Sequence, residues 1–180
     1  VFLGHCAASA ATGSSNFVLG HQAGKCMTSG SGNILLTHGA SADNGAAWTG
    51  SNTVAIGKQA GRRLCGSSSN NVFLGKYSGQ CVTTGGSNVF IGDEAGCGSN
   101  AKTGSNNVVL GKSAGTNLSS ANHNFFGGYK AGCATTTGAC NIFLGQQAGL
   151  SSNGTGNVFL GSYAGKCATS GDGNFFVGYG

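Results

Sequence analysis

The chain has 180 residues, of which 36 are glycine and none is proline, and only 7% are charged, with a formal net charge of +5. Low charge combined with 39% hydrophobic residues excludes an intrinsically disordered chain. No apolar run approaches the ~18 residues of a membrane-spanning helix, and the short apolar runs that do occur are typical of strands.

Short apolar tetrapeptides, most of them ending in glycine, recur along the whole chain. We predict a strand at each of them, in chain order at residues 1–4, 17–20, 34–37, 54–57, 72–75, 89–92, 108–111, 125–128, 142–145, 158–161 and 175–178. The last position of each tetrapeptide is the frame position, which is glycine in every copy except the third, where it is Thr37. The ten steps from Gly4 to Gly178 cover 174 residues, so the mean period is 17.4. This period predicts one solenoid array over residues 1–180.

The two faces of each predicted strand are both apolar. Side chains alternate along a strand, so the residues three and one before the frame position share a face, and the residue between them points the opposite way. In the copy at 72–75, Val72 and Leu74 share one face and Phe73 occupies the other. A strand that is apolar on both faces is expected to be buried on both.

A second, weaker strand is predicted in each coil about ten residues before the frame position, in a column that includes Met27, Val82 and Leu118. Hydroxyl and glycine columns follow it, and asparagine precedes the first strand in nearly every copy, where stacked amides can form a ladder. The predicted fold is therefore all-β, a parallel β-solenoid or β-roll with about 17 residues per coil, two short strands per coil and about ten coils. Since the chain starts and stops within its motif, we expect a fragment of a longer solenoid or a unit that stacks end to end.

The central column of the strands is rich in phenylalanine, and each phenylalanine buries about 150 Å² or more. We interpret six of these residues as an apolar ladder between chains: Phe73, Phe90, Phe126, Phe143, Phe159 and Phe176. If phenylalanine instead fills the coil interior, the valine and leucine face must meet another chain, because a soluble monomer rarely exposes so large a patch. Both cases predict lateral association of copies, as a trimer or a bundle. The alternative is a wide roll whose own loops cover both faces.

Two segments resemble known repeats. Residues Ser51–Gly57 (S-N-T-V-A-I-G) are similar to the N-S/T-V-A-I-G repeat in the heads of trimeric autotransporter adhesins. Residues Asn157–Gly161, followed by Ala164-Gly165, resemble glycine- and asparagine-rich repeats of phage tail fibres and bacterial surface proteins. The resemblance implies a parallel β-roll, usually trimeric, that serves as an extended stalk or adhesive head at a cell or virion surface.

The chain has eight cysteines, and an extracellular rod favours disulfides. Cys65, Cys81 and Cys97 recur at a spacing of 16 residues, close to the coil period, so bridges between adjacent coils fit the predicted geometry. Cys133 and Cys140 flank a threonine-rich turn and are placed to close one loop. The connectivity stays open, bridges between chains included, and the alternative is buried free thiols. The absence of a C-x-x-C pair argues against a zinc or redox motif.

No catalytic constellation is visible, so we predict a protein that is not an enzyme and needs no cofactor. His5, His21 and His38 directly follow the frame position in successive copies; they would stack, and we favour an exposed column over a metal site. Asp93 and Glu94 are adjacent, so on a strand they point apart and make a poor acid/base pair. The Lys and Arg residues are too sparse for a nucleic-acid groove, and no membrane span is expected.

Two N-glycosylation patterns begin at Asn117 (N-L-S) and Asn153 (N-G-T), and the hydroxyl column offers O-glycosylation sites. Glycans would help to keep a rod with so little charge in solution.

The sequence predicts a structural repeat protein that forms an extracellular filament or fibre through coil stacking and lateral association of copies. The alternative is the shaft or head of a phage tail fibre or bacterial surface adhesin, which would bind a cell-surface receptor or glycan through exposed side chains. Candidates for that binding are Tyr77, Tyr129, Tyr163 and Lys130. An ice-binding solenoid ranks third, because adjacent threonines such as Thr83-Thr84 diverge on a strand.

Overall fold

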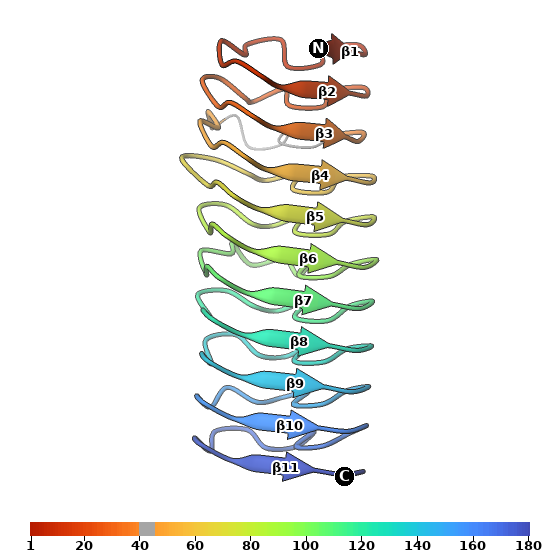
Figure 1. Cartoon of the computed structure of the whole chain (residues 1–180), viewed down its shortest axis with the longest axis vertical. Helices are drawn as coiled ribbons and strands as arrows, with labels where there is room; N and C mark the ends of the chain where they lie inside the picture. Colours follow the sequence, from red (N-terminus) through yellow and green to blue (C-terminus); the bar gives the residue numbers. More distant parts are fainter. Residues whose placement is uncertain (40–45) are drawn as a thin grey trace.

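A computed structural model describes residues 1–39 and 46–180. Its strands form one parallel sheet of eleven strands whose order in space is the order in the chain (Figure 1). The strands are β1 (Phe2–Leu3), β2 (Phe17–Leu19), β3 (Ile34–Leu36), β4 (Val54–Ile56), β5 (Val72–Leu74), β6 (Val89–Ile91), β7 (Val108–Leu110), β8 (Phe125–Gly127), β9 (Ile142–Leu144), β10 (Val158–Leu160) and β11 (Phe175–Val177). The predicted parallel β-solenoid with coils roughly 17 residues apart is confirmed.

The pairing register follows the repeat residue by residue. In β5 and β6, for example, Val72 pairs with Val89, Phe73 with Phe90 and Leu74 with Ile91. Most strand positions therefore stack apolar residues on apolar residues of the next coil, and nearly all contacts join adjacent coils. One hydrogen bond, from Arg63 to the Ser99 carbonyl, spans two coils. No helix in the described residues is long and apolar enough to cross a membrane.

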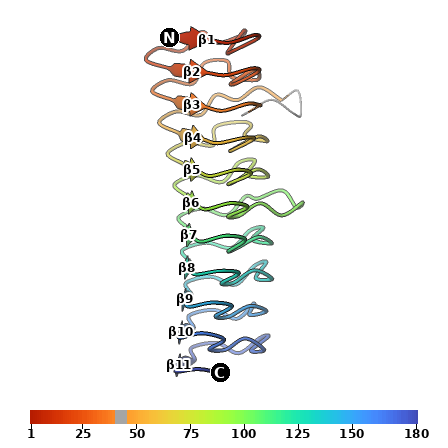
Figure 2. The same ribbon diagram turned by 90° about the vertical axis from the view of Figure 1, so that its right-hand side faces the viewer.

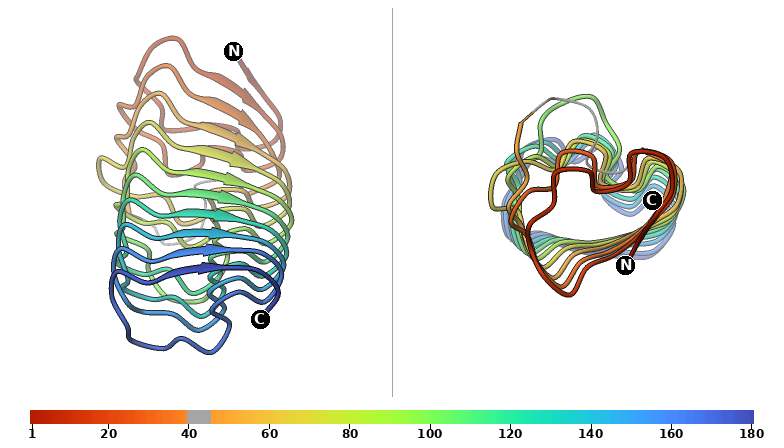
Figure 3. Two further views of the ribbon diagram at one scale, coloured as in Figure 1. Left: turned by 60° about the horizontal axis from the view of Figure 1, so that its bottom comes forward. Right: turned by 90° about the horizontal axis from the view of Figure 1, so that it is seen from above.

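All the strands lie along one side of the solenoid, and the connecting loops lie on the opposite side (Figure 2). Seen along the axis, the coils superpose on a common closed outline, from which the loop between β6 and β7 projects (Figure 3). That loop belongs to a long coil, since the frame positions Gly92 and Gly111 are 19 residues apart.

The second strand predicted in each coil is wrong in extent. Opposite the sheet, the described residues make only isolated pairings, Met27 with Trp48, Trp48 with Gly66, and Val82 with Lys102. These pairings fall where the second strand was expected. Turns interrupt the chain on this side of the solenoid, however, since Gly61 and Gly66 both have positive φ. An extended strand cannot form between such closely spaced turns.

The central residue of each strand points into the solenoid, so the assignment of the phenylalanine ladder to an interface between chains is wrong. Phe73, Phe90, Phe126, Phe143 and Phe159 are all fully buried within one chain. From Phe126 to Phe176 the rings stack at centroid distances of 4.8 to 5.0 Å, a favourable separation for aromatic rings. Phe176 is 44% exposed because no further coil of the described chain covers it.

Small residues on the turn after each strand make room for these rings. In most described copies a buried alanine lies three residues after the frame position, as Ala95 and Ala131 do, and glycine follows it. Gly96, which follows Ala95, has a φ of 59°, and a Cβ placed there would lie 2.5 Å from the Phe90 ring. The A-G pair of the repeat thus lets the chain turn sharply directly over a phenylalanine.

A ladder of buried asparagine amides runs the length of the solenoid beside the strands. In Asn107, Nδ2 donates to Asn88 Oδ1 (3.1 Å) and to the Ala121 carbonyl (2.8 Å). Its Oδ1 accepts hydrogen bonds from the backbone N–H and the Nδ2 of Asn124. The members of this amide ladder are Asn16, Asn33, Asn71, Asn88, Asn107, Asn124, Asn141, Asn157 and Asn174. Each buried amide is satisfied by the neighbouring coils, so the ladder ties every coil to the next.

Thr53 interrupts the amide ladder, and Trp48 replaces its missing donor. In the register of the ladder, an amide at position 53 would donate to the Ser68 carbonyl, because the acceptor lies three residues before the next asparagine. The buried Trp48 indole donates its Nε1–H to that carbonyl at 2.9 Å. The long third coil therefore fills its core with a side chain whose polar end completes the hydrogen bonding.

We expect the Trp48→Phe variant to lose roughly 2 kcal/mol of unfolding free energy, because the Ser68 carbonyl is left without a donor and a small cavity forms. Adding Thr53→Asn should restore about half of that loss by returning an amide to the ladder. Urea titrations of the single and double variants test this. A double variant no more stable than Trp48→Phe alone would contradict the compensation.

Candidate functional site: the outer face of the sheet

The residues before and after the central residue of each strand point away from the core and form two rows along the solenoid; in the first coil the residue before it, Val1, precedes β1. The first row comprises Val1, Phe17, Ile34, Val54, Val72, Val89, Val108, Phe125, Ile142, Val158 and Phe175. The second row comprises Leu3, Leu19, Leu36, Ile56, Leu74, Ile91, Leu110, Gly127, Leu144, Leu160 and Val177. No polar or charged side chain interrupts either row, and together they are called the outer face below.

The outer face is uncovered. Figures 1 and 2 show the strands along one side of the solenoid, with no described segment passing over them. Away from the ends, Phe17 is 43% exposed and Ile34 is 40% exposed. The two rows expose on the order of 1,000 Å² of apolar surface, more than the few hundred Å² of a typical monomer's largest patch. Parallel sheets are normally covered on both faces, so the uncovered outer face is unusual for a sheet of this kind.

A column of mostly polar residues borders the outer face where the strands end. It begins with His5, His21 and His38, whose rings stack at 5.3 and 5.2 Å with interplanar angles of 11°. Rings stacked in this way direct their nitrogen lone pairs side by side rather than toward a common point, which does not suit a shared metal ion. Within residues 1–39 and 46–180, no group of three or more potential ligands could hold a metal.

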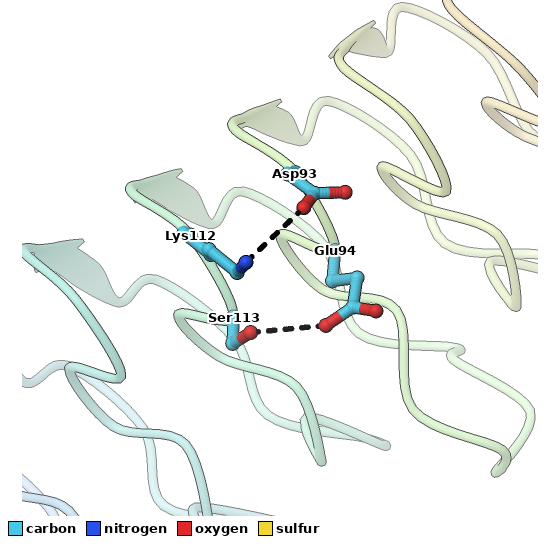
Figure 4. Close-up of polar contacts among 4 residues, drawn as sticks. All are labelled: Asp93, Glu94, Lys112 and Ser113. Atoms are coloured by element: carbon cyan, nitrogen blue, oxygen red, sulfur yellow. Dashed lines mark hydrogen bonds and ion pairs between the residues drawn. The ribbon is translucent and has the colours of Figure 1, made fainter.

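Farther along, the same column carries Asp93 and Lys112, which form an ion pair of 3.5 Å between adjacent coils (Figure 4). Glu94 instead accepts a hydrogen bond from Ser113 Oγ at 3.1 Å. The two carboxylates therefore engage different partners and do not form an acid/base pair. Because both members of the ion pair are well exposed, it contributes at most about 1 kcal/mol.

Three tyrosines pair with lysines near this edge of the outer face. The ammonium groups lie 4.8 Å from the Tyr77 ring for Lys76, 5.3 Å from Tyr129 for Lys130, and 4.9 Å from Tyr163 for Lys166. Gln146 also donates to the Tyr163 hydroxyl at 3.2 Å. Of the four side chains expected to be exposed, Tyr129 is exposed, whereas Tyr77, Tyr163 and Lys130 are half-buried.

All eight cysteines are free thiols. The bridges expected among Cys65, Cys81, Cys97, Cys133 and Cys140 are not formed. Cys81 is buried, Cys140 is exposed and the other three are half-buried. Arg63 donates to Cys81 Sγ at 3.8 Å, and the Cys97 thiol donates to Gln80 Oε1 at 3.4 Å.

The two glycosylation candidates lie in different environments. Asn153 is exposed, and its Oδ1 accepts hydrogen bonds from the backbone N–H and the hydroxyl of Thr136. Asn117 is half-buried, and its backbone N–H donates to the Cys133 carbonyl. Glycosylation of either residue stays a prediction.

Lys102 is a buried cation that the sequence analysis did not single out. It lies in the long coil between β6 and β7 and is only 2% exposed. Its Nζ donates to the carbonyls of Thr116 (2.8 Å) and Leu118 (2.6 Å) in the next coil. Burial lowers the pKa of Lys102 from 10.5 to about 8, because the charged ammonium loses hydration. In the sequence, the sign of an irregularity at Lys102 was the extra length of its coil, because the structure has to accommodate the additional residues of an insertion.

Lys102 makes stability depend on pH. Between pH 8 and 10.5 the unfolded chain binds a proton at this lysine that the folded chain has released, so unfolding free energy rises with pH. Burial, and next the Glu94 carboxylate, raise the pKa of Cys97 above 9.0, which opposes the rise at higher pH. We expect a gain of about 1 kcal/mol from pH 8 to pH 9.

Urea unfolding at these two pH values tests the dependence on Lys102. Lys102→Met should abolish the gain, whereas the exposed Lys58→Met should keep it. An unchanged gain in Lys102→Met would contradict the assignment.

The structure thus brings the apolar rows together on one face. No family model, curated protein or solved structure matches this chain.

Proposed function

We propose that this chain is a structural repeat protein that builds an extracellular filament or fibre by coil stacking and lateral association of copies. The observation that carries the proposal is the uncovered apolar outer face. A stable protein interface buries about 800 Å² per partner, and the outer face offers a surface of that size. Its lack of any charged side chain fits a permanent interface better than a transient one.

Coil stacking supports the same role. Each coil pairs with the next through backbone hydrogen bonds, the amide ladder and stacked side chains, and these contacts repeat along the axis. Further coils, from a continuation of the chain or from another copy, would add no new type of contact. The extracellular location rests on the resemblance to adhesin heads and tail fibres.

Sedimentation velocity and negative-stain electron microscopy of the purified chain test the proposal. We expect multimers at micromolar concentration and elongated, uniform particles or filaments. A chain that stays monomeric at tens of micromolar, with the outer face in water, would refute lateral association.

The alternative proposal is the shaft or head of a tail fibre or surface adhesin. The tyrosine–lysine pairs beside the outer face favour it, since aromatic faces and amide or ammonium groups together suit recognition of glycans. A discrete, SDS-resistant trimer that binds cells or a glycan array would support this role over a filament. Loss of binding in Tyr129→Ala and Tyr163→Ala with the trimer intact would place the binding at this edge.

A further inference from the structure

Strand β8 departs from the pattern of the outer face. Most strands carry valine or isoleucine in the first row and leucine or isoleucine in the second, but β8 has Phe125 in the first and Gly127 in the second. Phe125 is 37% exposed, close to the 39% of Ile142 in the next coil, and its ring is the larger of the two side chains. At Gly127 the second row lacks a side chain, and Leu144 leans toward the gap, with Cδ2 2.9 Å from where a Cβ would lie.

The two outward-facing residues of β8 have the same total side-chain size as those of most other strands. In β8, however, the large side chain stands in the first row, and the second row has none. Phenylalanine plus glycine has as many side-chain heavy atoms as valine plus leucine, the pair found in β5, β7 and β10. The ring and the gap lie side by side on the same strand. Phenylalanine also stands in the first row of β2 and β11, but in the described strands β8 alone sets it beside a position without a side chain, a gap that Leu144 partly fills.

The way two copies meet decides whether the Phe125 ring and the gap at Gly127 match. If copies are related by an axis parallel to the solenoid, strand direction reverses across the contact, so the first row faces the second row of the same coil. Phe125 then lies over Gly127 of the neighbour, and the reciprocal contact forms as well. If the solenoids run antiparallel, the first row always faces the first row, and Phe125 meets another bulky side chain while no phenylalanine reaches the gap.

We propose that copies of this chain associate through the outer face in parallel and in register, with Phe125 of each copy seated at Gly127 of its neighbour. This inference rests on the proposed lateral association and specifies its partner, direction and register. Both a twofold and a threefold axis along the solenoid produce the contact, because both set the first row against the second row at the same height.

The columns that flank the outer face agree with a parallel assembly. Lys58, Lys76 and Lys112 border the second row, and in the same three coils the opposite border carries Asn52, Asn70 and Asn106. A parallel, in-register contact sets each lysine beside an uncharged asparagine. An antiparallel contact sets the lysine column, which also contains Asp93, against its own copy, so lysines meet lysines in several registers that do not align them with Asp93.

A double-variant cycle on β8 tests the register. Phe125→Val alone leaves a void opposite Gly127, and Gly127→Leu alone sets a leucine against Phe125, so each should weaken association at least about tenfold. The double variant Phe125→Val/Gly127→Leu restores the pattern of the other strands and should return within about threefold of the original affinity. Gly127 does not have positive φ, so its backbone accepts a side chain once the end of the flexible Leu144 side chain, 2.9 Å from the new Cβ, moves aside.

Sedimentation equilibrium under reducing conditions gives the dissociation constants, and circular dichroism verifies that each variant folds. A mismatched double variant, Phe125→Val/Val158→Leu, adds one side-chain carbon in β10, two coils away from the gap. Its association should stay as weak as that of Phe125→Val. Additive losses in the β8 double variant, in a chain that still associates, would overturn the register and leave the proposed function standing. A chain that does not associate at all would overturn both.

Discussion

Replacing Asn107 by alanine is expected to lower the unfolding free energy by about 3 kcal/mol or more. The substitution removes a buried amide that exchanges hydrogen bonds with both neighbouring coils. The backbone N–H and Nδ2 of Asn124 and the Ala121 carbonyl then lie in the core without their partner. Buried polar groups left in this state lose their full solvation free energy.

The neighbouring asparagine provides a matched control. Asn106 is exposed and has a φ of 61°, so Asn106→Gly keeps the backbone conformation and should change stability by less than about 1 kcal/mol. Urea titration gives the free energies, and hydrogen exchange shows whether coils on both sides of Asn107 loosen, as in an array stabilised by its neighbours. A loss in Asn107→Ala no larger than in Asn106→Gly would mean that the amide ladder is not a main source of stability.

The second large effect is expected from charge on the outer face. The double variant Val89→Lys/Ile91→Lys places two lysines in the middle of the apolar rows, on side chains that point away from the core. Association should weaken by about 100-fold or more, because buried ammonium groups without partners are strongly unfavourable. The fold should persist, since neither residue packs in the interior.

A variant with the same added charge on the side of the solenoid opposite the sheet distinguishes the loss of an interface from the effect of net charge. Thr84→Lys/Thr103→Lys alters two exposed residues away from the sheet and should leave the dissociation constant within about threefold. Sedimentation equilibrium compares the two variants. Equal weakening by both would indicate general charge repulsion rather than a contact through the outer face.

The register of the solenoid could be predicted to the residue, because each strand position repeats one kind of side chain. Which face of each strand points into the core could not be predicted, because Phe73 and its neighbours Val72 and Leu74 are all apolar. The deciding information lay outside the strand: the small pair after most frame positions, Ala-Gly in most copies and Ser78-Gly79 after β5, leaves space over a phenylalanine ring and nothing wider. Reading that pair as the partner of the central column would have placed phenylalanine inside.

The side of the solenoid opposite the sheet was harder to predict, because it is built from turns and from single large side chains. Trp48 and Lys102 each lie in a long coil, and each satisfies carbonyls of the next coil from within the core. Neither residue fits a column of the repeat, so the periodicity of the sequence did not predict the position of either side chain in the core. For Trp48, the missing asparagine at position 53 was a visible sign that another donor had to replace it.

The most direct test of the interface is a cryo-electron microscopy map of the assembled protein. We predict that the outer face of each sheet lies about 10 Å from the outer face of a neighbouring copy, the usual spacing of packed sheets. A map in which Val72, Ile91 and the rest of the two rows face solvent, with copies joined only through their loops or ends, would contradict the account.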